Sequence, residues 1–313
     1  MRIAVMGAGG VGGFFGAKLA SAGNDVTFIA RGRHLDAIRA NGLRVESGTG
    51  AMHIAKARAT DDVDSASLAD VVMFCVKLWD VESAAQRIAP LLADRGVVIP
   101  FQNGLDSPEV LNRIVGPERV LGGVAYIAAT IREPGVIAHT GTMARLRVGA
   151  FPGGRVEAAH AFASACREAS VDVEVSSDIR RALWEKFCFL AAFAGCTCAA
   201  RQAIGVVRAD PDLRATFEGA VREAWSVGRS AGVPLADDYV KGTLTAIDML
   251  PAEMKASMLH DLEAGRRLEA PWLSGAVVKM AAQAGLDAPI SRALYAAVKP
   301  YLNGTARSAV QGA

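Results

Sequence analysis

The feature that most constrains this chain is a glycine-rich run directly behind a short apolar segment. Residues 3–6 have the composition of a buried strand, and Gly7-Ala8-Gly9-Gly10-Val11-Gly12 leads from them into a helical pattern over 11–22. Between a strand and a helix, the first glycine of such a run permits a tight turn, the second admits a pyrophosphate, and the third lets the helix pack closely on the strand. The N–H groups at the helix start favour phosphate oxygens. The run therefore predicts a dinucleotide-binding loop rather than a purely structural turn.

The first half of the chain alternates short apolar runs with helical patterns, which is typical of a parallel sheet covered by helices on both faces. A hairpin is expected from residues 136–139 and 145–149 around Thr140-Gly141-Thr142, then a helix over 156–169 and a strand over 171–175. The strands expected in the parallel sheet are 3–6, 26–30, 71–76, 97–101 and 120–127, with helices over 11–22 and 81–92 among them.

From Asp178 onward strand-like runs give way to long Ala-rich helical patterns with prolines at their breaks. The expected helices are 178–202, 211–231, 237–248, 253–264, 267–284 and 289–302. The fold class predicted is α/β, with an N-terminal Rossmann-type parallel-sheet domain over 1–177 and an all-α domain over 178–313. Ser177 or Asp178 is expected to cap the first helix of the second domain.

Composition excludes several classes of function. The net charge is +2, which gives no electrostatic case for nucleic acid. The five cysteines are irregularly spaced, so neither a disulfide framework nor a metal site is expected, and we interpret them as buried helical packing residues. The uncharged run over 187–200 is too short to span a bilayer, so no membrane segment is expected either. These observations predict a reduced, cytoplasmic protein.

The end of the second predicted strand bears on the choice of dinucleotide. An NAD-binding chain usually places Asp or Glu there to hold the adenosine ribose, whereas this strand ends in Arg31-Gly32-Arg33. A guanidinium offers charge and paired donors to a 2′-phosphate. Arg31, with Arg33 as an alternative, therefore favours NADPH; the competing interpretation of Arg31 is a solvated charge in a turn.

Several further segments resemble the ketopantoate reductase (2-dehydropantoate 2-reductase) family in order and spacing over nearly the whole chain. They are Val76-Lys77, Gln102-Asn103-Gly104, Trp184-Glu185-Lys186, and Ser257-Met258-Leu259-His260-Asp261 followed by Glu269. The resemblance implies an oxidoreductase of pantothenate biosynthesis that reduces a small 2-oxo acid to its (R)-2-hydroxy acid with hydride from NADPH.

The resemblance also implies the roles of individual residues. Lys186 is the general acid, Asn103 orients the nicotinamide end and the substrate, and Lys77 lies near the nicotinamide ribose and substrate. Glu269 binds the substrate hydroxyl, and Ser257 contacts the substrate carboxylate. The competing interpretations are a solvent-exposed lysine for Lys186, strand-end or turn residues for Lys77 and Asn103, and helix-surface groups for Ser257 and Glu269. Asp261 and Arg266 are expected to form a structural ion pair.

Three positions depart from the family pattern. Leu190 and Ala194 stand one and two turns after Lys186, where the family has asparagines facing the substrate, so we expect a more hydrophobic 2-oxo acid. Asp80 replaces a glutamine in the family's Lys-x-x-Gln and is expected to pair with Lys77. Pro271 follows Glu269 and predicts that a helix starts anew there.

Two other functions stay open on the sequence. A 3-hydroxy-acid or opine-type dehydrogenase shares the two-domain layout, and an NADPH-binding sensor without turnover would tolerate the loss of both helix-face asparagines. Apolar residues such as Trp225, Trp272 and Tyr301 leave a homodimer possible, although such residues more often belong to a core.

Overall fold

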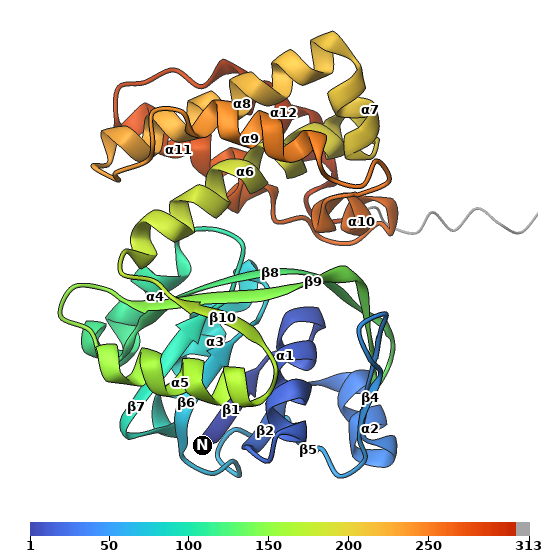
Figure 1. Cartoon of the computed structure of the whole chain (residues 1–313), viewed down its shortest axis with the longest axis vertical. Coiled ribbons are helices and arrows are strands. Elements are labelled where there is room, and N and C mark those ends of the chain that lie inside the picture. Colours follow the sequence, from blue (N-terminus) through green and yellow to red (C-terminus); the bar gives the residue numbers. More distant parts are fainter. Residues whose placement is uncertain (305–313) are drawn as a thin grey trace, which may run out of the picture. The chain divides into compact units, whose positions relative to one another are not determined.

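The computed structural model describes residues 1–304 and begins with a five-stranded parallel sheet (Figure 1). Its strands run in the order β5-β2-β1-β6-β7. The four strands expected near residues 3–6, 26–30, 71–76 and 97–101 are confirmed, whereas 120–127 joins this sheet only through a bridge between Val98 and Val120. The strand bounds are β1 Arg2–Met6, β2 Asp25–Ile29, β5 Arg58–Thr60, β6 Ala69–Phe74 and β7 Leu92–Pro100.

A second sheet, which the sequence patterns did not predict as such, contains the longest strands of the described chain. Strand β9 pairs antiparallel with β8 along one edge, and along its other edge it pairs with β3 and then with β10. The bounds are β3 Leu43–Ser47, β4 Met52–Ile54, β8 Leu121–Glu133, β9 Val136–Ala150 and β10 Asp172–Val175.

The predicted hairpin around Thr140-Gly141-Thr142 is wrong, because β9 continues through it. The reversal lies at Pro134-Gly135, between β8 and β9. Pairing of Ile127 with Ala144 and of Ala129 with His139 places residues 140–143 opposite Ala128 alone. The run is therefore a bulge at which β9 passes from its β3 partner to its β10 partner. Thr140, Gly141 and Thr142 form this bulge, and the strand continues on either side of it.

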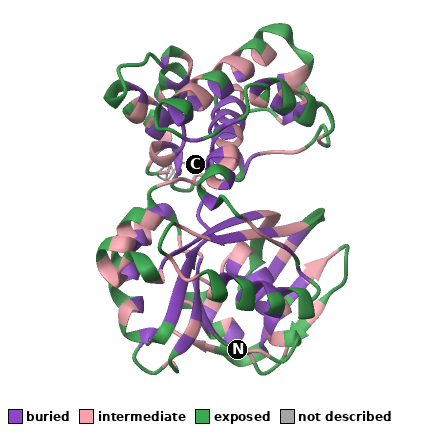
Figure 2. Cartoon of the chain, turned by 60° about the vertical axis from the view of Figure 1, so that its left-hand side comes forward, coloured by how far each residue is buried: buried purple, intermediate pink, exposed green. Residues whose placement is uncertain are grey.

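Helix α1 lies against strands of both sheets, so one apolar core serves the two (Figure 2 shows the buried strand interiors). The sheet that we expected to be covered by helices alone is thus partly covered by a second sheet, with α1 between them. Helices α3 and α4 pack together, while α5 packs on β9 and β10. The bounds are α1 Gly10–Ser21, α2 Gly32–Asn41, α3 Val81–Ile88, α4 Ser107–Val115 and α5 Val156–Glu168.

The rest of the described chain is helical, as predicted. Asp178 caps α6 through a 2.9 Å hydrogen bond from the N–H of Arg181, and prolines occupy the first positions of α8 and α12. The helix expected over 267–284 is wrong in its first part: Pro271 lies in a short 3₁₀ turn, and α11 starts after it. The bounds are α6 Ile179–Ala200, α7 Ile204–Ala209, α8 Pro211–Ser230, α9 Tyr239–Asp248, α10 Ser257–Glu263, α11 Ser274–Gln283 and α12 Pro289–Val298.

The chain divides into two compact units, one comprising 1–102 and 106–183 and the other 103–105 and the residues from 184 onward. The first unit extends past the predicted boundary at 177/178 because Ile179 and Ala182 of α6 pack with Val124 of β8. By length and composition alone, helix α6 could cross a membrane. However, 67% of its most apolar 18-residue stretch is buried within the protein. That burial is typical of a core helix.

The cysteines are free thiols, and within residues 1–304 no cluster of His, Cys, Asp and Glu could hold a metal ion. Cys166, Cys188, Cys196 and Cys198 are buried in α5 and α6, as expected. Cys75 is an exception, since it follows strand β6 and is only half-buried. Burial raises the pKa of the other four thiols to about 12, which disfavours reactive thiolates.

Candidate active site

The glycine run forms the turn between β1 and α1, and its backbone geometry explains the glycines. Gly7 has φ +100°, and a Cβ there would lie 2.9 Å from the carbonyl of Cys75. A Cβ on Gly10 would lie 2.0 Å from the carbonyl oxygen of Ala129, and a Cβ on Gly12 would lie 2.2 Å from that of Gly7. A Cβ on Gly9 would meet nothing within 4 Å. Gly7, Gly10 and Gly12 therefore let neighbouring backbone segments approach the loop closely. The backbone at Gly9 faces open space instead.

His34 of α2 ties this loop to the β8–β9 turn, a role that the sequence analysis missed. The N–H of Gly135 donates to Nδ1 of His34 (3.0 Å), and Nε2 of His34 lies 2.8 Å from the carbonyl oxygen of Ala8. Because Gly135 can only donate and the Ala8 carbonyl can only accept, the imidazole is neutral and carries its proton on Nε2. Burial lowers the pKa of His34 below its ordinary value.

Arg31 follows β2, as predicted, and its partner is Asp80. The Arg31 guanidinium donates to the Asp80 carboxylate at 2.7 Å, with the Arg31 side chain 82% exposed and that of Asp80 25% exposed. The Lys77 ammonium, which we expected to pair with Asp80, lies 5.5 Å from the ring centroid of Trp79. Lys77 is exposed at the end of β6, where a parallel sheet of this kind places ligands.

Lys186 and Asn103, to which the family resemblance gave separate roles, are hydrogen-bonded to each other. The Lys186 Nζ donates to Oδ1 of Asn103 at 2.9 Å, although 83 residues separate the two. Burial lowers the pKa of the Lys186 ammonium to about 8, and the nearby Glu269 carboxylate opposes that shift. Glu269 is itself buried, at 7% exposure. The arrangement is a half-buried proton donor held by an amide oxygen, with an acid beside it.

The other predicted substrate residues have different surroundings. Leu190 is half-buried one turn after Lys186, whereas Ala194, a further turn on, is 2% exposed within the helical core. Ser257 is the exposed first residue of α10. Asp261 and Arg266 form the predicted structural pair, with Nε of Arg266 2.7 Å from Oδ1 of Asp261.

Gln102 is a buried polar residue next to Asn103 that was not among the predicted site residues. Its Nε2 donates to the carbonyls of Phe74 (2.9 Å) and Val76 (3.2 Å) at the end of β6. Both partners are acceptors, so the amide orientation is determined, and Oε1 has no hydrogen-bond partner within the described part of the chain. The signal that could have identified Gln102 is a polar amide directly after the apolar run that ends β7.

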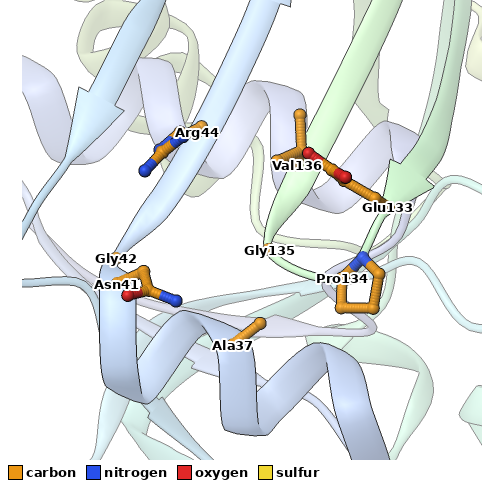
Figure 3. A pocket seen from close by; sticks show the side chains of 8 residues that line it. All are labelled: Ala37, Asn41, Gly42, Arg44, Glu133, Pro134, Gly135 and Val136. Atoms are coloured by element: carbon orange, nitrogen blue, oxygen red, sulfur yellow. The ribbon is translucent and has the colours of Figure 1, made fainter.

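One surface pocket, with an empty volume of about 350 Å³, lies between the end of α2 and the β8–β9 turn (Figure 3). None of its lining residues is a predicted site residue. They are Ala37, Asn41, Gly42, Arg44, Glu133, Pro134, Gly135 and Val136.

Comparison with known proteins identifies a family over most of the chain. Residues 3–153 match the family described as ketopantoate reductase PanE/ApbA, and residues 178–302 match its C-terminal part. A 2-dehydropantoate 2-reductase of Mesorhizobium japonicum is 33% identical, with 96% of this chain and 97% of that protein covered. The uncharacterized oxidoreductase YkpB of Bacillus subtilis is 30% identical, with 96% and 99% covered.

The fold agrees with this likeness. The crystal structure of 2-dehydropantoate 2-reductase from Geobacter metallireducens superposes with a TM-score of 0.90 at 30% identity, covering 96% of this chain and 99% of that one. The sequence resemblance, the predicted fold class and the expectation of an oxidoreductase are confirmed. This chain belongs to the ketopantoate reductase family.

Proposed function

We propose that the protein reduces the keto group of a small 2-oxo acid to the (R)-2-hydroxy acid, with NADPH as cofactor and Lys186 as general acid. The observation that carries the proposal is the Lys186–Asn103 hydrogen bond beside Glu269, with a pKa of about 8 at Lys186. A general acid performs best when its pKa lies near the working pH. The relatives named as 2-dehydropantoate 2-reductases support the substrate class.

The residues present fit a bound dinucleotide. The backbone at Gly9 faces open space where a pyrophosphate would approach, and α1 begins at Gly10. Gln102 offers a buried acceptor without a partner in the described chain, close to the end of β6. Residues Gly7, Ala8, Gly9, Gly10, Val11 and Gly12, with Arg31, Lys77 and Asn103, would hold the cofactor.

The cofactor, when bound, supplies hydride to the carbonyl carbon, and the protein's own residues manage the charge that develops on oxygen. An ammonium carries three donors, of which one engages Asn103, so Lys186 can also donate to the substrate oxygen. Proton transfer from Nζ then yields the hydroxyl. Glu269 would accept a hydrogen bond from that hydroxyl, and Ser257 would contact the carboxylate.

Turnover tests this proposal directly. The full-length protein should oxidise NADPH in the presence of ketopantoate or of 2-oxo acids with larger apolar side chains. Lys186→Gln should lower kcat by about 10²- to 10⁴-fold, the usual contribution of a general acid, while the Kd of NADPH stays close to that of the unsubstituted protein. Nucleotide binding without turnover on any 2-oxo acid would contradict reductase function and favour a sensor. Turnover restricted to 3-hydroxy acids or imines would favour the other dehydrogenase class.

Within this function we propose that Leu190 biases the substrate toward an apolar side chain. Leu190→Asn should raise kcat/KM for ketopantoate relative to a bulkier apolar 2-oxo acid, because it restores a polar partner for the substrate hydroxyl. Ala194→Asn is a poor companion, since Ala194 is 2% exposed and a larger side chain would overpack the core. Leu190→Met serves as the apolar control. An unchanged substrate ratio in Leu190→Asn would contradict the assignment.

A further inference from the structure

The ion pair between Arg31 and Asp80 spans the end of the sheet at the glycine loop. Arg31 follows β2 and Asp80 ends the turn after β6, while β1 lies between those two strands and leads into Gly7. Strands two places apart are separated by roughly 10 Å. The 2.7 Å contact of Arg31 with Asp80 therefore reaches across β1, in front of the loop proposed to bind the dinucleotide.

We propose that Asp80 is a cofactor-selectivity residue, whose carboxylate competes with a 2′-phosphate for Arg31 and lowers the preference for NADPH over NADH. This inference rests on the proposed function, because it concerns the adenosine end of the same cofactor site. It assigns Asp80 the role that an acid at the end of β2 has in NAD-binding proteins. Here β2 ends without an acid, and the carboxylate comes from the turn after β6.

The exposure of the pair makes competition feasible. Arg31 is 82% exposed, and exposed ion pairs are only marginally stable, so a phosphate can displace the carboxylate. After displacement the carboxylate still lies near the site and repels a group that carries nearly two negative charges. The 2′-hydroxyl of NADH has no such charge and can donate a hydrogen bond to a carboxylate. The same acid thus disfavours one cofactor and favours the other.

A purely structural role for the pair makes a different prediction. If Asp80 only joined the turns after β2 and β6, its removal would weaken both cofactors by the same factor and lower the thermal midpoint. A selectivity role changes the ratio of the two dissociation constants. The ratio therefore separates the two roles, and it can be measured without turnover.

The experiment measures Kd for NADPH and for NADH by calorimetry on full-length Asp80→Asn, Asp80→Glu and Arg31→Gln variants. Asp80→Asn should raise the affinity for NADPH relative to NADH by about tenfold, because one nearby like charge is removed. Asp80→Glu retains the carboxylate and should keep a ratio near that of the unsubstituted protein. Arg31→Gln should lose affinity for NADPH while retaining most of its affinity for NADH.

Glu82→Gln is the matched control, because Glu82 is an exposed acid two residues further on whose partner is Arg113. It should leave both dissociation constants unchanged. A ratio that is the same in Asp80→Asn and in the unsubstituted protein would overturn the inference while leaving the proposed function intact. Failure of the unsubstituted protein to bind either nucleotide would overturn both.

Discussion

At the scale of single residues, Lys186 couples burial to the pH dependence of catalysis. Its pKa of about 8 means that the ammonium form required to donate a proton is lost as the pH rises through 8. We therefore expect kcat/KM for reduction to fall above about pH 8, and the rate of the reverse oxidation to rise over the same range.

Substitution of Glu269 tests the cause of that pH limb. The Glu269 carboxylate raises the pKa of Lys186, so Glu269→Gln should shift the falling limb to lower pH as well as reduce the rate. Glu263→Gln, at a partly exposed acid that pairs with Lys255, is the control and should leave the limb in place. A limb that does not move in Glu269→Gln would show that another group controls it.

His34 provides a second prediction at this scale. Its folded-state pKa lies below its unfolded value of about 6.5, so the unfolded chain takes up the proton first as the pH falls. The stabilisation by His34 is thus complete above about pH 6.5 and is lost progressively below it. His34→Gln should show a smaller drop in thermal midpoint between pH 7 and pH 5 than the unsubstituted protein. Equal drops would exclude His34 as the source.

At the scale of elements, different glycines of the β1–α1 turn are expected to serve folding and nucleotide binding. Gly10→Ala should reduce the free energy of unfolding by about 1–3 kcal/mol, because its Cβ would collide with the backbone of Ala129. Gly9→Ala should leave stability nearly unchanged but weaken nucleotide binding, since its Cβ projects into open space. Denaturant unfolding and NADPH titration of both variants check this. A Gly9→Ala protein that binds NADPH normally would argue against a pyrophosphate at that position.

At the scale of the whole molecule, the division into two units predicts which fragment is stable. A fragment of residues 1–183 should have a higher thermal midpoint than one of residues 1–177, because it keeps Ile179 and Ala182 against Val124. It should also bind NADPH without turnover, since it lacks Lys186. Circular dichroism melts of the two fragments test the first point, and a fragment 1–177 of equal stability would contradict it.

Local patterns in the sequence determined much of this protein. The strand–glycine–helix order around Gly7 predicted the loop after β1, and the positions of Asp178, Pro211 and Pro289 predicted where helices begin. These features depend on backbone geometry within a few residues, so they can be interpreted without knowledge of the fold. The family resemblance added the Lys186 and Asn103 pair, whose hydrogen bond the structure contains.

Only the tertiary structure decided the features that depend on distant partners. The Thr140-Gly141-Thr142 run became a bulge because β9 changes partner there, and a turn-forming composition alone cannot report what lies across the sheet. Asp80 pairs with Arg31, 49 residues away, because strands β2 and β6 lie on either side of β1 in the parallel sheet. The link from His34 to Ala8 and Gly135 likewise exists only once α2 and the β8–β9 turn have packed together. Periodicity encodes which face of an element is buried, but the contacts of a polar group depend on which elements the fold brings beside it.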